Sequence, residues 1–128
     1  MTGDWIVLSA PHTTQRNELQ AKVHFETNSA WFSGHFPGQP VLPGVAILAA
    51  AARLAVKGGL EDGRPVDVLG FKKVRFTQLV SPGEELIISL SPARDVEEEK
   101  VLPFAVLCRG RRVCHGGLLV GYAKIAST

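Results

Sequence analysis

The sequence predicts an α+β fold in which one long buried helix is wrapped by a curved antiparallel sheet. Three observations favour this class: a strictly alternating segment at residues 19–26, an alanine-rich stretch without helix breakers at 45–57, and several short apolar segments after residue 68 that turn sequences separate. A strand, a helix and then a run of strands pack most economically as a sheet curled around the helix. A chain of 128 residues is long enough for one such domain, which we expect to span residues 1–128.

The first element is a half-buried strand from Leu19 to Glu26. Apolar and polar residues alternate strictly along it, so each kind occupies one face of the strand. The apolar positions are Leu19, Ala21, Val23 and Phe25, and the polar positions are Gln20, Lys22, His24 and Glu26. The segment that follows, NSAWFSGHFPGQP, is rich in turn-forming residues and predicts an ordered loop.

The second element is a helix from Val45 to Lys57. Pro43 is tolerated in a first helical turn, where its missing N–H would be unpaired in any case. No breaker interrupts the stretch, and Gly58-Gly59 is a natural stop. The helix is apolar nearly all round, with alanines between the larger residues, which predicts burial on most of its sides.

Four strands are expected in the second half of the chain, after the loop GLEDGRPVD. They lie near residues 68–76, 85–91, 101–109 and 113–124, and the turn signals SPGE, SPARD and RGRR separate them. The acidic run Glu97–Glu99 is expected to be an exposed turn or the end of a strand.

Composition and charge exclude several classes of protein. The net charge of +2 is too small to imply nucleic-acid binding, although two basic clusters, at residues 72–75 and 109–112, would suit an acidic partner as well as plain solvation. No apolar run reaches the roughly 20 residues that span a bilayer, and the N-terminus does not read as a signal peptide. We therefore expect a cytoplasmic protein, with Cys108 and Cys114 as reduced thiols rather than a disulfide. Neither cysteine has metal-ligand spacing, and we expect no metal or cofactor.

One loop carries a chemical signal. Its glycines and prolines form a stiff frame that holds His35 between Phe32 and Phe36. Histidine can act as a general base near neutral pH, and the first helical amides, at Gly44 or Val45, could polarise a carbonyl. Together they would suit removal of a proton α to a thioester. A lone histidine in such a loop can equally be a structural hydrogen-bonding residue, so the residues by themselves leave both interpretations open.

The loop FSGHFPGQPVLPGV resembles the signature of the hot-dog-fold 3-hydroxyacyl-acyl carrier protein dehydratases of fatty-acid synthesis. The similarity continues in GFKKVRFTQLVSPGEELIISL and covers roughly residues 23–124 in matching order. The segment from residue 53 to 55 is closest to a divergent branch, the aryl-polyene-type dehydratase-like proteins. The resemblance implies a dimer, or a higher homo-oligomer, whose sheets join edge to edge. It also implies acyl tunnels at the subunit interface and a substrate carried by acyl carrier protein or coenzyme A.

The resemblance also implies roles for individual residues. His35 matches the catalytic histidine that takes the C2 proton of a (3R)-3-hydroxyacyl thioester. Gly44 matches the glycine whose amide binds the thioester carbonyl, with Val45 next to it. Phe36 and Pro43 would shape the tunnel.

The helix departs from the family pattern at one position. Six residues beyond Pro43, where the family has a glutamate or aspartate that helps the hydroxyl leave, this chain has Ala49, and no acid occurs anywhere on the helix. Because a positioned general acid contributes on the order of 10²–10⁴ in rate, this loss predicts a crippled dehydratase unless something compensates. Arg53 lies one turn beyond Ala49 and could bind a substrate oxygen. It cannot replace the acid, and solvation or pairing near the helix end is its more ordinary role.

Three routes would compensate for the missing acid or make it unnecessary. His35 could perform both proton transfers through a bound water, or the protein could have stopped dehydrating substrates. In the third route a residue from elsewhere replaces the acid, and the candidates are Glu26, His24, Asp62, His12 and His115, including groups from the unusual N-terminal segment. The sequence therefore favours a dehydratase-like enzyme, with a non-catalytic acyl- or carrier-binding module as the main alternative. A hot-dog thioesterase ranks last, because such enzymes also depend on a carboxylate near the helix and lack this loop.

Overall fold

The computed structural model describes residues 6–25, 42–59, 64–81 and 83–123, and it contains one helix and eight strands within these ranges. The helix α1 spans Gly44–Gly58. The strands are β1 (Ile6–Leu8), β2 (His12–Thr13), β3 (Leu19–Phe25), β4 (Val66–Phe76), β5 (Leu86–Leu90), β6 (Arg94–Val96), β7 (Glu99–Cys108) and β8 (Arg111–Tyr122).

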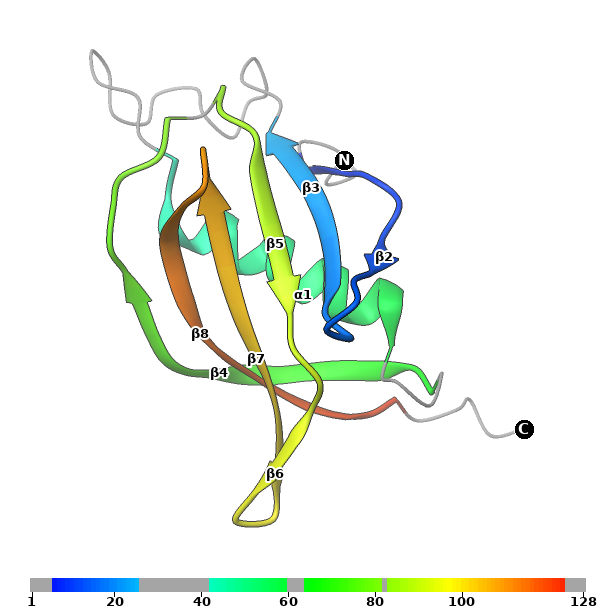
Figure 1. Ribbon diagram of the computed structural model, residues 1–128. Helices are drawn as coiled ribbons and strands as arrows, with labels where there is room; N and C mark the ends of the chain where they lie inside the picture. Colours follow the sequence, from blue (N-terminus) through cyan, green and yellow to red (C-terminus); the bar gives the residue numbers. More distant parts are fainter. Residues whose placement is uncertain (1–5, 26–41, 60–63, 82, 124–128) are drawn as a thin grey trace, which may run out of the picture.

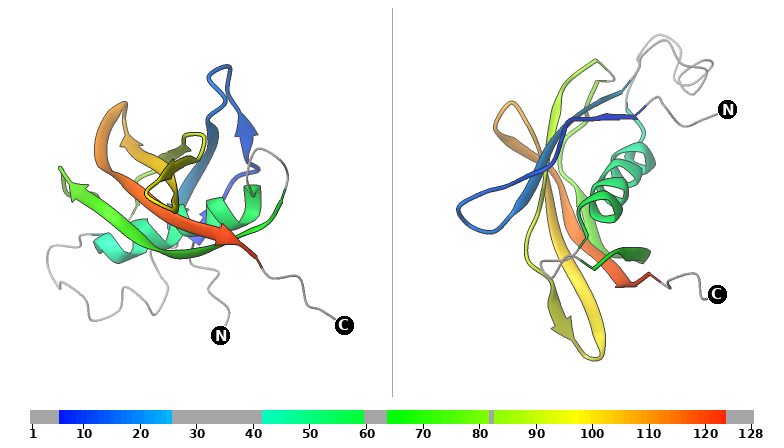
Figure 2. Two further views of the ribbon diagram at one scale, coloured as in Figure 1. Left: turned by 90° about the horizontal axis from the view of Figure 1, so that it is seen from below. Right: turned by 90° about the vertical axis from the view of Figure 1, so that its right-hand side faces the viewer.

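The strands form one antiparallel sheet that curls around the helix. The main order is β1-β3-β5-β7-β8-β4, with β2 added to β3 and β6 added to β7. Figure 1 shows the helix lying across the concave side of this sheet, and the two views of Figure 2 show the strands bending around it. This is the architecture that the sequence predicts, and it is the hot-dog fold.

The core lies between α1 and the concave face of the sheet. Six helical residues contribute to it, namely Ala46, Ile47, Ala50, Ala51, Leu54 and Ala55. Four of these six are alanines, so the helix backbone can approach the strands closely. The larger core side chains come mainly from the sheet; Phe25, Leu86, Ile88 and Leu118 are among the largest that are fully buried.

The opposite side of the helix is less covered than its composition predicts. Val45 is 61% exposed and Val56 is 52% exposed. The prediction that most sides of the helix are buried is therefore only partly correct for the described residues, because a single sheet covers one face of a helix. Apolar side chains left on the other face mark a surface that a further layer could cover.

The helix ends nearly where the sequence places them. It begins at Gly44, and Pro43 is the N-cap residue with extended backbone angles (φ −61°, ψ 141°) rather than part of the first turn. At the other end Gly59 adopts a positive φ of 69°, and its N–H bonds to the carbonyl of Ala55 at 2.9 Å. The glycine pair thus stops the helix as expected, because glycine reaches positive φ at little cost.

The four predicted strands of the second half are present as β4, β5, β7 and β8, but three short strands were not predicted. The strands β1, β2 and β6 contain only two or three residues each, too few to show a period of two. The segment SPARD was expected to be a turn, yet Arg94 and Asp95 belong to β6. The acidic run is a tight turn at Glu97 and Glu98, which both have positive φ, and it ends in the first residue of β7.

The β7–β8 turn is a two-residue hairpin loop. Arg109 and Gly110 have φ values of 54° and 78°, the conformation of a type I′ turn, and Cys108 pairs with Arg111 across it. Cys108 and Cys114 are both buried free thiols, as the sequence predicts. Among the described helices, none is long and apolar enough to cross a membrane.

Candidate functional site

The N-terminus of α1 is an open set of backbone donors. Among the described residues no side chain caps it, and its first turn contains no acidic residue. The amide of Ala46 bonds back to the carbonyl of Pro43 at 3.0 Å, which leaves the amides of Gly44 and Val45 at the head of the helix. The positive end of the helix dipole lies at the same place, so this terminus favours an oxygen that carries partial or full negative charge.

Two contacts, one from the end of β4 and one from the β4–β5 connection, hold this helix start. The amide of Leu42 donates to the carbonyl of Val80 at 2.7 Å. The ring of Phe76 lies against Gly44, where an added Cβ would be only 2.7 Å from Cζ of the ring. Glycine is therefore needed here for close approach rather than for an unusual backbone angle.

The residues that the resemblance assigns to the site are only partly described. His35 and Phe36 lie outside the described residues. Pro43 is half-buried next to the helix start, and Val45 is exposed beside it. Ala49 is half-buried and packs against the core, so the position of the missing acid is on a partly accessible face of α1.

Arg53 has a structural contact of its own. Its Nη1 donates to the carbonyl of Ile6 at 3.2 Å in a part-buried bond, which attaches β1 to the helix, and the residue as a whole is exposed. This contact links the helix to β1, and a role of Arg53 toward a substrate stays a prediction.

Three of the candidate replacements for the missing acid lie away from the helix start. His24 is exposed on β3, between the buried residues Val23 and Phe25, and therefore projects from the convex face. His12 is exposed on β2, whose hairpin with β3 lies beside the C-terminal end of α1 and shares a hollow of about 350 Å³ with Gly58 and Gly59. Glu26 and Asp62 lie outside the described residues.

His115 is the third of these candidates, and it is half-buried on the convex face of the sheet. It is paired with Ala105 on β7 and with Arg75 on β4. It lines a shallow groove of about 270 Å³ together with Arg112 and the buried Ser89. Its neighbours Cys114 and Gly116 pair with Val106 and Phe104, which are core residues, so His115 itself faces away from the helix.

Near the helix start the structure brings together a group that sequence reasoning missed. Glu84, at the end of the β4–β5 connection, accepts a bond from the Cys108 thiol (Sγ to Oε2, 2.9 Å) and lies 3.4 Å from Nε of Arg109. The thiol bond and a bond from the Ser81 amide lower the pKa of the Glu84 carboxyl, which keeps it ionised. Burial and the same carboxylate raise the pKa of Cys108 to about 11. A sequence signal for Glu84 was available, because SPGE is a turn sequence that ends in this glutamate.

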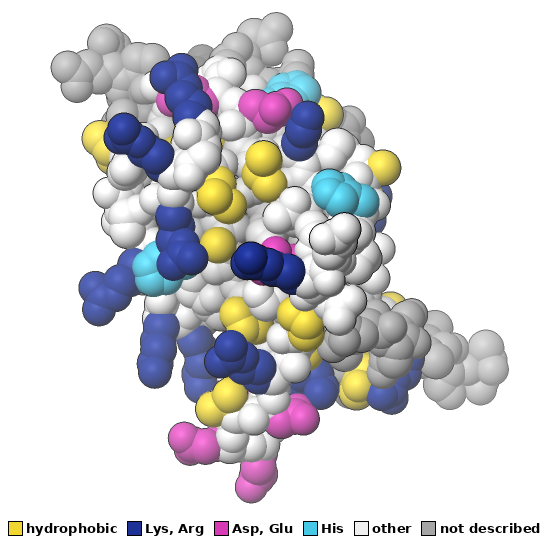
Figure 3. All heavy atoms as spheres, viewed as in Figure 1, with side chains coloured by type: hydrophobic (Ala, Val, Ile, Leu, Met, Phe, Trp, Pro, Cys, Tyr) yellow, Lys and Arg dark blue, Asp and Glu magenta, His cyan; other side chains and the backbone are white. Residues whose placement is uncertain are grey.

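Basic side chains gather on one part of the convex surface. In Figure 3 many of the Lys and Arg side chains lie along the left of the view, over β4 and the first part of β8, although others lie in the centre and on the right. Acidic side chains lie at the bottom, around the β6–β7 turn, and also near the top. The exposed basic residues of β4, of β8 and of the β7–β8 turn are Lys72, Lys73, Arg75, Arg109, Arg111 and Arg112. Lys72 also pairs with Glu99. This basic surface would attract an acidic macromolecule.

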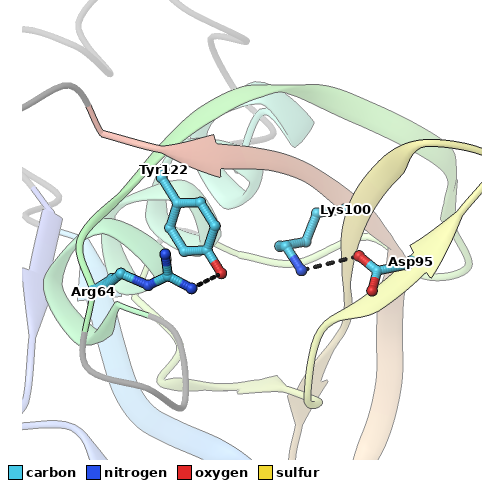
Figure 4. Close-up of polar contacts among 4 residues, drawn as sticks. All are labelled: Arg64, Asp95, Lys100 and Tyr122. Atoms are coloured by element: carbon cyan, nitrogen blue, oxygen red, sulfur yellow. Dashed lines mark hydrogen bonds and ion pairs between the residues drawn. The ribbon is translucent and has the colours of Figure 1, made fainter.

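A second polar cluster surrounds Tyr122 at the end of β8 (Figure 4). Arg64 donates to the Tyr122 hydroxyl at 2.6 Å, and its guanidinium carbon lies 3.7 Å from the ring centroid. Lys100 lies 5.8 Å from the same centroid and bonds to Asp95 at 2.9 Å, which raises the pKa of the lysine. These cation–π and ion-pair contacts join the start of β4 to the base of the β6–β7 hairpin and have a structural role. Within the described ranges no group of three or more His, Cys, Asp or Glu could hold a metal ion.

Comparisons with known proteins agree with this architecture. The ApeI-like family of ApeI dehydratases matches residues 11–117. A 3-hydroxyacyl-acyl-carrier-protein dehydratase FabZ from Klebsiella pneumoniae is 32% identical over 114 residues, which is 84% of this chain and 76% of that protein. The FabZ of Syntrophobacter fumaroxidans is 44% identical over 81 residues, but this match covers only 57% of this chain and 53% of that one.

Solved structures show the same fold. The dehydratase heterocomplex ApeI:P from Xenorhabdus doucetiae aligns with a TM-score of 0.68 at 23% identity and covers 89% of this chain and 96% of the other. The thioesterase HI1161 from Haemophilus influenzae aligns with a TM-score of 0.67 at 16% identity, covering 95% of this chain and 80% of the other. Because dehydratases and a thioesterase fit equally well, these alignments support the fold and do not separate the two activities.

Proposed function

Because this chain belongs to the ApeI-like dehydratase family and is related to FabZ, we propose that it is a dehydratase subunit acting on (3R)-3-hydroxyacyl thioesters. The observation that supports this most directly is the uncapped helix start at Gly44, which follows the GHFP loop in the chain and offers its first amides to an oxygen. A thioester carbonyl bound there would gain negative charge as the C2 proton leaves, and the helix terminus would stabilise that charge.

In the proposed reaction His35 removes the C2 proton. The C2–H electron pair forms the C2–C3 double bond while the C3–O bond breaks, and the leaving hydroxide must gain a proton to depart as water. No carboxylate on α1 can donate it, because Ala49 occupies the usual position. The proton balance closes without that acid if His35 returns the proton it has taken, through a bound water.

We place the acyl chain beside Phe36, Pro43, Val45 and Ala49. Val45 and Ala49 both lie at the accessible side of α1, which supports this assignment. The carrier would be acyl carrier protein or coenzyme A. The exposed basic surface over β4 and β8 supports an acidic carrier, since charge of opposite sign speeds association.

We further propose that the working form is at least a dimer of cytoplasmic, single-domain chains joined along β4. This strand ends the main order of the sheet, and Leu69 and Phe71 on it are 69% and 37% exposed. An edge strand with exposed apolar residues is a template for pairing with another strand. A relative of known structure is part of a heterocomplex, so a second, different hot-dog chain is an alternative partner that could also supply the absent acid.

A non-catalytic binding subunit is the second candidate, and Ala49 is the observation that favours it. Such a protein would keep the helix start and the acyl site but would not release enoyl product.

Turnover of 3-hydroxyacyl thioesters by the purified chain, compared with His35→Ala, tests the proposal. We expect enoyl formation that the substitution reduces by at least about 10²-fold. Turnover that does not change in His35→Ala would remove this histidine from the mechanism. Acyl binding with no turnover, by the chain alone and with a co-expressed partner, would favour the binding subunit.

A further inference from the structure

We propose that Glu84 is a positioning residue for the Gly44 amide, acting through the β4–β5 connection. The inference rests on the proposed function in one respect, namely that the Gly44 amide binds the thioester oxygen. The connection consists of residues 77–85, of which residue 82 lies outside the described ranges.

The connection is the element that contacts the helix start. The carbonyl of Val80, within it, accepts the Leu42 amide at 2.7 Å. Phe76, the last residue of β4, lies against Gly44. A shift of this connection therefore moves the Val80 carbonyl and the segment entering the helix, whereas Phe76 is held in β4 by its pairing with Cys114 on β8.

The connection is fastened to β8 and its hairpin at two points. At the first, the amide of Thr77 donates to the Val113 carbonyl at 2.9 Å, and its hydroxyl donates to the Arg112 carbonyl at 2.7 Å. The second point is Glu84, whose Oε2 receives the Cys108 thiol and lies near Arg109.

Glu84 also closes the turn on itself. Its Oε1 accepts the Ser81 amide at 3.2 Å, and its own amide donates to the Ser81 carbonyl at 3.1 Å. One carboxylate thus uses both oxygens, one to shape the turn and the other to attach it to the hairpin. Between the connection and the hairpin lies a hollow of about 460 Å³, lined by Gln78, Leu79 and Arg111 among others, so packing in this region is open.

These facts make Glu84 more than a turn residue. Leu79 is 83% exposed, and of the apolar residues described in this connection only Val80 is buried. With so little apolar contact, the connection depends on its polar attachments. Loss of the Glu84 attachment should let the Val80 carbonyl shift, and with it Leu42 and the Gly44 amide.

The experiment compares Glu84→Ala with Glu84→Gln, and uses Glu85→Ala as the matched control. Glutamine keeps an oxygen acceptor of similar reach, while Glu85 is an exposed neighbour outside these contacts. The first measurement is the ¹⁵N–¹H spectrum of each folded variant, read at Leu42 and Gly44. The second is kcat and KM with a 3-hydroxyacyl thioester.

We expect Glu84→Ala to shift both amides and to lower kcat by about tenfold or more, with a smaller effect on KM. The ceiling is the 10²–10³-fold loss seen when an oxyanion donor is removed outright. Glu84→Gln should restore most of both readouts, and Glu85→Ala should resemble the wild type. If Glu84→Ala does not fold, Cys108→Ala removes the thiol bond and a buried sulfur but keeps the Glu84 contacts to Ser81 and Arg109, and it should move the same amides by less.

The outcomes separate this proposal from the proposed function. Unmoved Leu42 and Gly44 amides in a folded Glu84→Ala or Cys108→Ala variant would overturn the positioning role, whatever the activity. Moved amides in a protein whose wild type has no turnover, either alone or with a co-expressed partner, would support the positioning role and refute the dehydratase. If the amides move but kcat is unchanged in an active enzyme, the proposed link between the Glu84 attachment and catalysis is overturned.

Discussion

The contact between Gly44 and Phe76 predicts that Gly44→Ala has opposite effects in two backgrounds. An alanine Cβ at this position would be 2.7 Å from Cζ of the ring, which is about 0.7 Å inside the 3.4 Å at which ordinary contact begins. Phe76 is 48% exposed, so the ring can move partly aside. We expect an overpacking cost at the lower end of the usual range, about 1–2 kcal/mol.

A second term has the opposite sign. Alanine is favoured over glycine in a helix by up to about 0.5–1 kcal/mol, because glycine loses more backbone entropy on folding. In the wild type the net effect of Gly44→Ala should therefore be a loss of about 0.5–1 kcal/mol in the free energy of unfolding. In a Phe76→Ala background the collision is gone, and the same substitution should be neutral or stabilising by about 0.5 kcal/mol.

Urea unfolding of the wild type, both single variants and the double variant gives the coupling energy directly. The expected value, the difference between these two effects, is about 0.5–1.5 kcal/mol, within the range for residues in contact. An equal cost of Gly44→Ala in both backgrounds would show that Phe76 does not rest on the helix start. That result would also remove one of the two contacts described at the helix start, and the bond between Leu42 and Val80 would remain.

Three further predictions concern the helix and the core. Restoring the acid by Ala49→Glu should raise the dehydration rate by a factor on the order of 10²–10⁴ if loss of the acid limits that rate. Ala52→Glu is the control. Equal rates for Ala49→Glu and the wild type would show that another group replaces the acid. Leu54→Ala, at a fully buried position, should lower the free energy of unfolding in urea by about 3–5 kcal/mol. Val56→Ala, at a position that is 52% exposed, should lower it by less than about 1 kcal/mol. Similar costs for the two variants would contradict the assigned helix face. Burial raises the pKa of Cys114 from 9.0 to about 11, so the contribution of this thiol to stability is complete below pH 9 and is lost between pH 9 and 11. A Cys114→Ala variant should therefore lose less stability than the wild type over that interval. Parallel curves of unfolding free energy against pH for the two proteins would refute the shift.

Much of the fold could be read from local patterns. The alternation at residues 19–25 specified β3, and the buried residues Ala21, Val23 and Phe25 lie where the period of two places them. The Gly58-Gly59 stop is equally local, because positive φ at the residue after a helix is a property of glycine itself. The strands β1, β2 and β6 were not visible in the sequence, because segments of two or three residues are stabilised by their neighbours and carry no period of their own.

The candidate site likewise has features that the sequence identified and features that only the structure revealed. The family resemblance identified the loop around His35, the helix start at Gly44 and the absence of an acid at Ala49, all of which are properties of consecutive residues. It did not find Glu84, since the partner of that carboxylate, Cys108, is 24 residues away in the chain and is brought beside it only by the sheet. It also left His12, His24 and His115 as candidate acids, and the curvature of the sheet was needed to place all three away from the helix start.

The sequence by itself determined the type and order of the main elements, the stiff histidine loop and the acid-free helix, because turn chemistry, periodicity and residue identity act over a few neighbouring positions. Only the tertiary structure decided which side of α1 the sheet covers, that Phe76 and Val80 meet the helix start, and that one carboxylate attaches their connection to a distant hairpin. Those contacts join residues far apart in the chain, and their geometry follows from the register and curl of the strands, which no local pattern specifies.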